Sequence, residues 1–202
     1  MTNLRNADDI ILLACSEIQL QELVDRLERV IRKYALLINV EKTKVMTTGG
    51  SSCSIDINNM LVEVVSSFPY LGSLITDDTE CTKDIRGRLA KGLGIGAKLK
   101  KTWQNHGIRI STKIRLMKAL VWPVAMYGCD SWTLNKDDEK RISAFAMKCL
   151  RKVLRVSWTA KRTNEWVLET AGVSKSLLAS VKEMKLAYYG HVLRKKGDCL
   201  KK

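Results

Sequence analysis

The chain has 202 residues, 46% of them hydrophobic, and a net charge of +14 at pH 7. This apolar content can form the core of one large domain or of two small ones. The sequence contains no apolar run of about eighteen residues and no basic-then-apolar leader, so we expect neither a membrane span nor a secretory signal. We therefore expect an intracellular protein, cytoplasmic or nuclear, that has no membrane partner.

The six cysteines are scattered along the chain without a Cys-x-x-Cys pair. This spacing argues against a disulfide framework and against a zinc finger. A zinc site formed by Cys149, His191 and Cys199 remains an alternative, although neither His106 nor His191 has an acid or cysteine at ligand spacing beside it. We expect reduced thiols, most of them in the core.

The charge is distributed unevenly. Residues 1–100 contain 13 Lys and Arg and 13 Asp and Glu, whereas residues 101–202 contain 22 and 8. A basic half beside a neutral half is typical of a polyanion-binding module joined to a module with another role, and nucleic acid is the leading candidate partner. The alternative is a set of solvated helix faces that are rich in lysine.

Near the start of the chain, Asn6-Ala7-Asp8-Asp9 leads directly into an apolar run, residues 10–14. Adjacent carboxylates beside a strand are suited to Mg²⁺ and to phosphoryl transfer between paired metal ions. Asp8 and Asp9 are therefore the candidate catalytic and metal-binding residues. Two other Asp-Asp pairs, Asp77-Asp78 and Asp137-Asp138, precede predicted helices and indicate helix caps, so the pair alone is a weak signal.

The rest of the first half is predicted to form one helix and several short strands. Ser16 and Gln19 have capping-box spacing before an amphipathic stripe, which predicts a helix. Residues 36–46 are predicted to be extended, and Asn58-Asn59 is predicted to be the turn of a hairpin. Residues 68–75 are predicted to form a further strand.

The second half is predicted to be helical. The expected helices cover residues 79–104 with a kink at the glycines, 111–127 capped by Ser111, a third helix capped by Asn135, a fourth over 164–171 that ends at Gly172, and a fifth from Ser174 to Arg194. All five tryptophans lie in this half, and we expect about three of them in its core.

Basic residues and a tryptophan gather at the end of the third predicted helix and just after it. Cations beside an aromatic ring can bind phosphates and stack on unpaired bases. The candidate nucleic-acid-binding residues are Lys148, Arg151, Lys152, Arg155, Trp158, Lys161 and Arg162.

Three motifs in order, the acidic pair, Asn39-x-x-Lys42-Thr43-Lys44 and Phe68-x-Tyr70-Leu71-Gly72, resemble the reverse transcriptase of non-LTR (LINE-like) retrotransposons. The resemblance implies an α+β fold, with a partial palm (a β-α-β unit plus hairpins) over residues 1–76 and an all-α basic thumb-like module over 77–202. It further implies that Asp8 and Asp9 bind Mg²⁺, that Asn6, Ala7 and Lys42 lie near the nucleotide, and that Tyr70, Leu71 and Gly72 form a primer-grip-like hairpin. Its partners would be an RNA template and a DNA primer.

The chain departs from this family in two ways. Asn6 stands where the family has an aromatic residue. In the family, a third catalytic carboxylate and the fingers precede the acidic pair, and this sequence has neither of them before Asp8. We therefore expect a truncated RNA-directed DNA polymerase that binds nucleic acid and does not polymerise alone, unless a complementing chain supplies the missing palm and fingers. The alternative is a helical protein-interaction or structural module without a nucleic-acid role.

Overall fold

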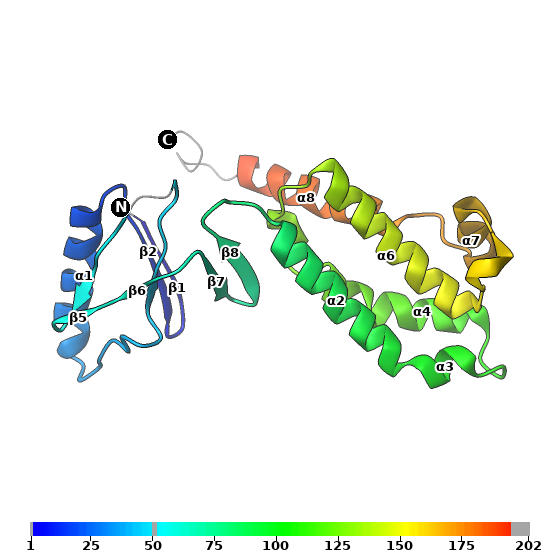
Figure 1. Ribbon diagram of the computed structural model, residues 1–202, viewed down its shortest axis with the longest axis horizontal. Helices are drawn as coiled ribbons and strands as arrows, with labels where there is room; N and C mark the ends of the chain where they lie inside the picture. Colours follow the sequence, from blue (N-terminus) through cyan, green and yellow to red (C-terminus); the bar gives the residue numbers. More distant parts are fainter. Residues whose placement is uncertain (1, 50–51, 195–202) are drawn as a thin grey trace. The chain divides into compact units, whose positions relative to one another are not determined.

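A computed structural model describes residues 2–49 and 52–194 of the chain. The chain divides into two compact units, Met1–Glu80 and Cys81–Lys202, a few residues after the predicted boundary. The first unit contains short strands and one helix, and the second is helical (Figure 1). Within the described residues, none of the helices has the length and apolarity needed to cross a membrane.

The first unit begins with an antiparallel hairpin. Its strands are β1 (Thr2–Asn6) and β2 (Asp9–Leu13), which pair from Asn6 opposite Asp9 to Thr2 opposite Leu13. The predicted strand is therefore present as β2, but its partner β1 was not predicted because a short polar segment has no period-2 apolar signal. The hairpin therefore pairs one edge of the strand that carries Asp9.

Helix α1 (Glu17–Arg32) begins where the capping pattern predicts. The Ser16 hydroxyl accepts a hydrogen bond from the Gln19 backbone N–H at 3.3 Å. Further along α1, the Gln21 side chain donates to the Asp56 carbonyl at 2.8 Å and accepts from the Asp56 N–H at 2.9 Å. These two bonds fix the helix on the strand that carries Asp56.

Four very short strands follow α1. They are β3 (Lys44–Val45), β4 (Asp56–Ile57), β5 (Met60–Leu61) and β6 (Glu63–Val64). β4 and β5 form the predicted hairpin, and both turn residues, Asn58 and Asn59, have positive φ as a type I′ turn requires. β3 pairs in parallel with β6.

The β-α-β unit that we expected is not formed, because β2 pairs with β1 and β3 pairs with β6. The segment predicted to be extended over residues 36–46 contains only β3. A turn replaces the rest: the Asn39 side-chain oxygen accepts the Lys42 N–H at 3.1 Å, and the Asn39 carbonyl accepts the Thr43 N–H at 3.0 Å. Asparagine favours such side-chain-to-backbone turns over strands.

A turn divides the predicted strand over residues 68–75 into β7 (Ser67–Tyr70) and β8 (Ser73–Thr76), which form the hairpin that the resemblance implies at Tyr70, Leu71 and Gly72. Its turn residues Leu71 and Gly72 have φ values of 47° and 82°. Glycine adopts this conformation readily, whereas it strains leucine. The small core of the first unit lies elsewhere, under α1, and consists of Val24, Val45, Ile55, Ile57 and Val62.

The second unit is a set of packed helices. Their bounds are α2 (Thr82–Lys98), α3 (Lys100–Gln104), α4 (Ile110–Leu120), α5 (Trp122–Ala125), α6 (Lys136–Leu154), α7 (Asn164–Ala171) and α8 (Leu177–Arg194). Two short 3₁₀ turns cover Cys129–Ser131 and Trp158–Ala160. Figure 1 shows α2 and α6 side by side as two long helices of this unit.

Two predicted helix ends in this unit are confirmed. Asn135 caps α6 by accepting the Asp138 N–H at 2.7 Å, and Gly172 ends α7 in the left-handed conformation. Three other predictions were wrong in detail. The break after α2 falls at Leu99 rather than at a glycine, α4 begins before Ser111, and Ser176 rather than Ser174 accepts an N–H at the start of α8.

The tryptophans meet the expectation of about three in the core. Trp103, Trp122 and Trp132 are buried, whereas Trp166 is half-buried. The Trp103 indole donates to the Gly96 carbonyl at 2.8 Å, which ties α3 back to α2. The Trp132 indole donates to the Asp84 carboxylate at 3.0 Å. Trp103 and Trp132 therefore have a satisfied N–H and stabilise the packing of the core.

Among the four glycines of α2, Gly92 packs most closely on the rest of the core. A Cβ atom added there would lie 3.0 Å from the Phe145 ring and 3.2 Å from the Ala125 methyl carbon. Gly87 lies on the same helix, and a Cβ added to it meets nothing within 4 Å. Substitution of the two glycines by alanine should therefore have different effects on the free energy of unfolding.

We expect Gly87→Ala to raise the free energy of unfolding by about 0.5–1 kcal/mol, since alanine restricts the unfolded chain and favours the helix. Gly92→Ala should instead lower it by about 1 kcal/mol, because the overpacking outweighs this gain. Urea denaturation of both variants measures the difference. Equal stabilisation by the two substitutions would contradict the close packing of α2 at Gly92.

Candidate functional site

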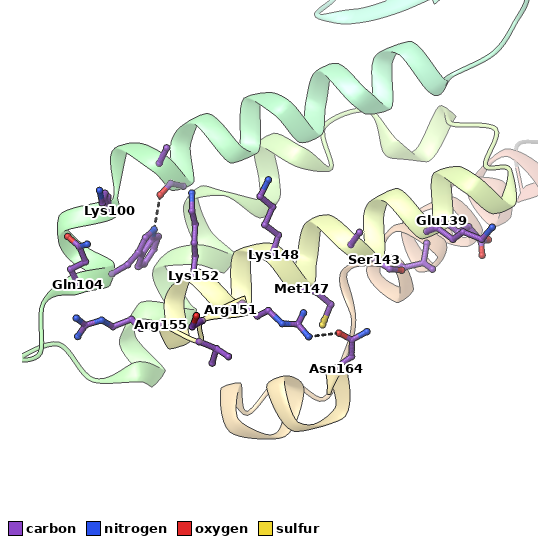
Figure 2. A pocket seen from close by; sticks show the side chains of 18 of the residues that line it. Lys100, Gln104, Glu139, Ser143, Met147, Lys148, Arg151, Lys152, Arg155 and Asn164 are labelled. Atoms are coloured by element: carbon purple, nitrogen blue, oxygen red, sulfur yellow. Dashed lines mark hydrogen bonds between the residues drawn. The ribbon is translucent and has the colours of Figure 1, made fainter. Parts of the chain in front are cut away.

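A groove of about 1510 Å³ runs along one face of α6 in the second unit (Figure 2). Ten lining residues belong to this helix or its C-cap, from Lys136 to Arg155, at spacings of three and four. This spacing places them on one face. Gly96, Ala97, Lys100, Trp103 and Gln104 line the groove from α2 and α3, and Asn164 and Leu178 line it from α7 and α8.

The opposite face of α6 is in the core. Ile142, Phe145, Cys149, Leu150 and Val153 are all buried there. This amphipathic division fixes the rotation of the helix, because turning it would expose these side chains to water. The groove face is therefore held in place by the packing behind it.

The groove is strongly cationic. Seven of its lining residues are basic, namely Lys100, Lys136, Lys140, Lys148, Arg151, Lys152 and Arg155. Among the lining residues that the structure describes, Glu139 is the one acid, and its carboxylate pairs with the Lys182 ammonium at 2.7 Å. An excess of one sign of charge in a hollow concentrates the field that attracts a polyanion.

The basic side chains of the groove differ in direction and in hydrogen-bond partners. Figure 2 shows Lys148 and Lys152 pointing from α6 toward α2 and α3, while Arg151 points to Asn164. The Arg151 guanidinium donates to the Asn164 side-chain oxygen at 2.9 Å and to the Arg162 carbonyl at 3.1 Å. Arg151 therefore holds the loop before α7 and lines the groove at the same time.

Arg155 ends α6 with a left-handed backbone conformation, φ 60°. Its guanidinium lies 2.7 Å from His106 Nε2, in the loop between α3 and α4. This contact links the two segments at one end of the groove.

Four of the seven predicted nucleic-acid-binding residues, Lys148, Arg151, Lys152 and Arg155, line this groove. Lys161 and Arg162 are exposed but lie outside its lining, and the Arg162 guanidinium stacks over the Trp166 ring at 4.9 Å. The side chain of Trp158 lies outside what the structure describes.

Sequence reasoning missed three basic residues of the groove, Lys100, Lys136 and Lys140. Lys136 and Lys140 stand at four-residue steps before Lys148 and Lys152, so helical periodicity could have found them. Lys100 lies on α3, and its place opposite α6 depends on tertiary packing.

The acidic pair lies at the turn of the first hairpin. Asp8 and Asp9 are both exposed, and Ala7 before them has a φ of 52°. Among the described residues, no group of three or more His, Cys, Asp and Glu side chains gathers in a way that can hold a metal ion. Two exposed carboxylates could hold Mg²⁺ only together with water, substrate oxygens or further ligands.

The other motifs of the first unit occupy turns. Lys42 is exposed in the turn before β3, and Leu71 and Gly72 form the β7–β8 turn beside Tyr70. β1–β2, β3–β6 and β7–β8 are separate two-stranded sheets. Each motif thus has a local structural explanation.

The zinc alternative finds little support at Cys149. This thiol is buried in the core of the second unit, and burial raises its pKa to about 11. At neutral pH it is a protonated, apolar side chain rather than a thiolate ligand. The other proposed ligand, Cys199, lies outside the described residues.

Alkylation tests this difference in thiol chemistry. At about pH 8, we expect iodoacetamide to modify Cys149 at least on the order of 100-fold more slowly than the exposed Cys15, because little thiolate forms and the reagent has no access. Peptide mass spectrometry of the folded chain gives both rates. Similar rates would place Cys149 in a solvent-accessible site.

Comparison with curated proteins finds a relative that matches nearly the whole chain. The chain is 28% identical to an uncharacterized transposon-derived protein of Caenorhabditis elegans, over 97% of this chain and 73% of that protein. No family model and no solved structure matches the chain. The chain is thus similar, over nearly its whole length, to a protein that derives from a transposon.

Proposed function

We propose that this chain descends from the reverse transcriptase of a non-LTR retrotransposon and that it binds nucleic acid through the groove along α6. The observation that carries the binding proposal is that seven basic side chains line the same groove. Lysine and arginine neutralise phosphates and release condensed counterions, which supplies most sequence-independent affinity for nucleic acid.

The proposed descent has separate support. The relative from C. elegans is transposon-derived and matches 97% of the chain. The order of the acidic pair, the Lys42 segment and the Tyr70-Leu71-Gly72 turn resembles the palm of this polymerase family. In this proposal residues 1–76 correspond to part of the palm, and the helical unit corresponds to the thumb and the region beyond it.

We do not assign polymerisation to the 202-residue chain by itself. In-line phosphoryl transfer depends on positioned metal ions and on a positioned nucleotide. Asp8 and Asp9 supply two exposed carboxylates, and among the described residues no further His, Cys, Asp or Glu side chain joins them in a group that could hold a metal ion. A longer polypeptide or a second chain would have to complete such a centre around Mg²⁺.

Fluorescence anisotropy with a labelled RNA strand and with a labelled RNA–DNA duplex tests the binding proposal. We expect saturable binding of at least one of the two at about 50 mM salt, with a loss of affinity toward about 200 mM. We expect Asp8→Asn to bind as the parent chain does, since the acidic pair lies outside the groove unit. Absence of binding at low salt by a folded sample would refute the proposal.

A protein-interaction role is the second candidate, and one feature of α8 favours it. Leu186, Tyr188, Tyr189 and Leu193 are large apolar residues that are 70%, 51%, 59% and 58% exposed. Exposed apolar clusters often mark protein contacts. A charged groove that binds no nucleic acid, together with concentration-dependent association lost in Leu186→Ser, would support this role instead.

A further inference from the structure

The floor of the groove along α6 is basic at both ends and apolar between them. Lys136 and Lys140 stand at one end and Lys148 and Lys152 toward the other, with Ala144 and Met147 between them. Met147 is half-buried, and Val156 and Leu178 add further apolar surface to the lining. The groove therefore combines cations with an accessible apolar floor.

This combination fits poorly with a duplex. A double helix presents charged phosphates and sugars on its outside, which would leave the apolar floor unused. A protein helix can read the bases of a duplex only by entering its major groove. α6 lies at the bottom of a groove flanked by α2 and α3 on one side and by α7 on the other, so it cannot enter one.

We propose that the groove binds single-stranded nucleic acid, with unpaired bases on the apolar floor and phosphates against the surrounding lysines. This inference rests on the proposed nucleic-acid-binding function and names the class of ligand. Single strands expose base faces that gain from apolar contact, and cationic grooves with such contact surfaces bind them with little regard to sequence. The excess of basic residues supplies the charge complementarity.

The length of the groove agrees with a short site. α6 has 19 residues, which at 1.5 Å per residue corresponds to about 28 Å. At 3.4 Å per stacked nucleotide this length accommodates about eight nucleotides, and fewer if the bases are splayed apart. The site size thus lies within the range of known single-strand-binding modules, about 4–16 nucleotides.

Three labelled probes that carry the same number of phosphates per strand test the inference. They are a strand of about 16 nucleotides, the duplex of that strand with its complement, and an abasic strand that keeps the sugars and phosphates. We expect the 202-residue chain to bind the strand about tenfold more tightly than either the duplex or the abasic strand.

The outcomes separate this inference from the function on which it rests. Equal affinity for all three probes would overturn the single-strand inference and leave phosphate binding intact, as would tighter binding of the duplex. Binding of none of them would overturn both proposals. A groove that binds an acidic amphipathic peptide in preference to all three would point to a protein ligand and would also overturn both.

A floor variant supplies a second readout. Met147→Ser removes the central apolar side chain, and we expect it to weaken binding of the strand about three- to tenfold while leaving the abasic strand unchanged. Leu120→Ser, an exposed residue of α4 outside the lining, is the matched control and should change neither. Circular dichroism confirms folding of both. Unchanged strand affinity in Met147→Ser would show that the floor makes no base contact.

Discussion

Reversing the charge of Lys148 and Lys152 together is expected to lower the affinity for nucleic acid on the order of 100-fold at about 50 mM salt. Both side chains are exposed on α6 and point across the groove toward α2 and α3 (Figure 2). Each substitution to glutamate removes a proposed phosphate contact and adds a repulsive charge at the same position. Anisotropy titration of the parent chain and of the double variant measures the loss.

The matched control reverses two cations elsewhere on the same unit. Arg109 and Arg115 are exposed, and neither lines the groove. Their double substitution by glutamate changes the net charge by the same amount, so it tests the effect of overall charge. We expect a loss of only a few-fold. Equal losses in the two double variants would mean that diffuse charge, rather than the groove, attracts nucleic acid.

The largest stability effect is expected at Asp138. Its side chain is fully buried, at 0% exposure, on the first turn of α6. One carboxylate oxygen accepts the Thr82 hydroxyl at 3.0 Å, and the other accepts the Arg141 guanidinium at 2.9 Å. The carboxylate therefore joins the first residue of α2 to α6, two of the long helices of this unit.

We expect Asp138→Ala to lower the free energy of unfolding by about 3 kcal/mol, because it removes a buried carboxylate and leaves the half-buried Thr82 hydroxyl and Arg141 guanidinium without their shared acceptor. Urea denaturation measures this change. Asp137→Ala is the control: Asp137 is the preceding residue, its carboxylate is exposed, and its hydrogen bond with Lys140 lowers its pKa. A solvent-exposed pair contributes little, so the control should change stability only slightly. Similar effects at the two positions would contradict the role of the buried carboxylate.

Local signals were sufficient for several elements. Ser16, Asn135 and Gly172 mark helix ends through side-chain or backbone preferences that act within one turn, and all three are in place. The Asn58-Asn59 turn was predictable for the same reason, because both residues tolerate positive φ. Such signals need no knowledge of distant packing.

The pairing of β3 with β6 was not predictable. β3 and β6 contain two residues each, which is too short for an alternating pattern to show. Their parallel pairing joins segments that no turn connects directly. The Asn39 turn leaves only β3 of the segment predicted to be extended. The expected β-α-β unit failed because tertiary pairing decided which short segments became neighbours.

The candidate groove was partly visible in the sequence. Lys148 and Lys152 stand out as charge at the end of a helix, whereas Lys136 and Lys140 lie among the acidic residues of its first turn, which balance their charge in the sequence. The opposing wall, with Lys100, required the packing of α3 against α6, which no local pattern shows.

The salt dependence of single-strand binding tests the central claim most directly. If about four to five groove lysines and arginines neutralise phosphates, the logarithm of the association constant should fall against the logarithm of salt concentration with a slope of about −3. Lys148→Glu/Lys152→Glu should reduce the magnitude of this slope by about 1.4, whereas Arg109→Glu/Arg115→Glu should leave it nearly unchanged. A slope near zero, or one that the groove variant does not alter, would contradict nucleic-acid binding through this groove.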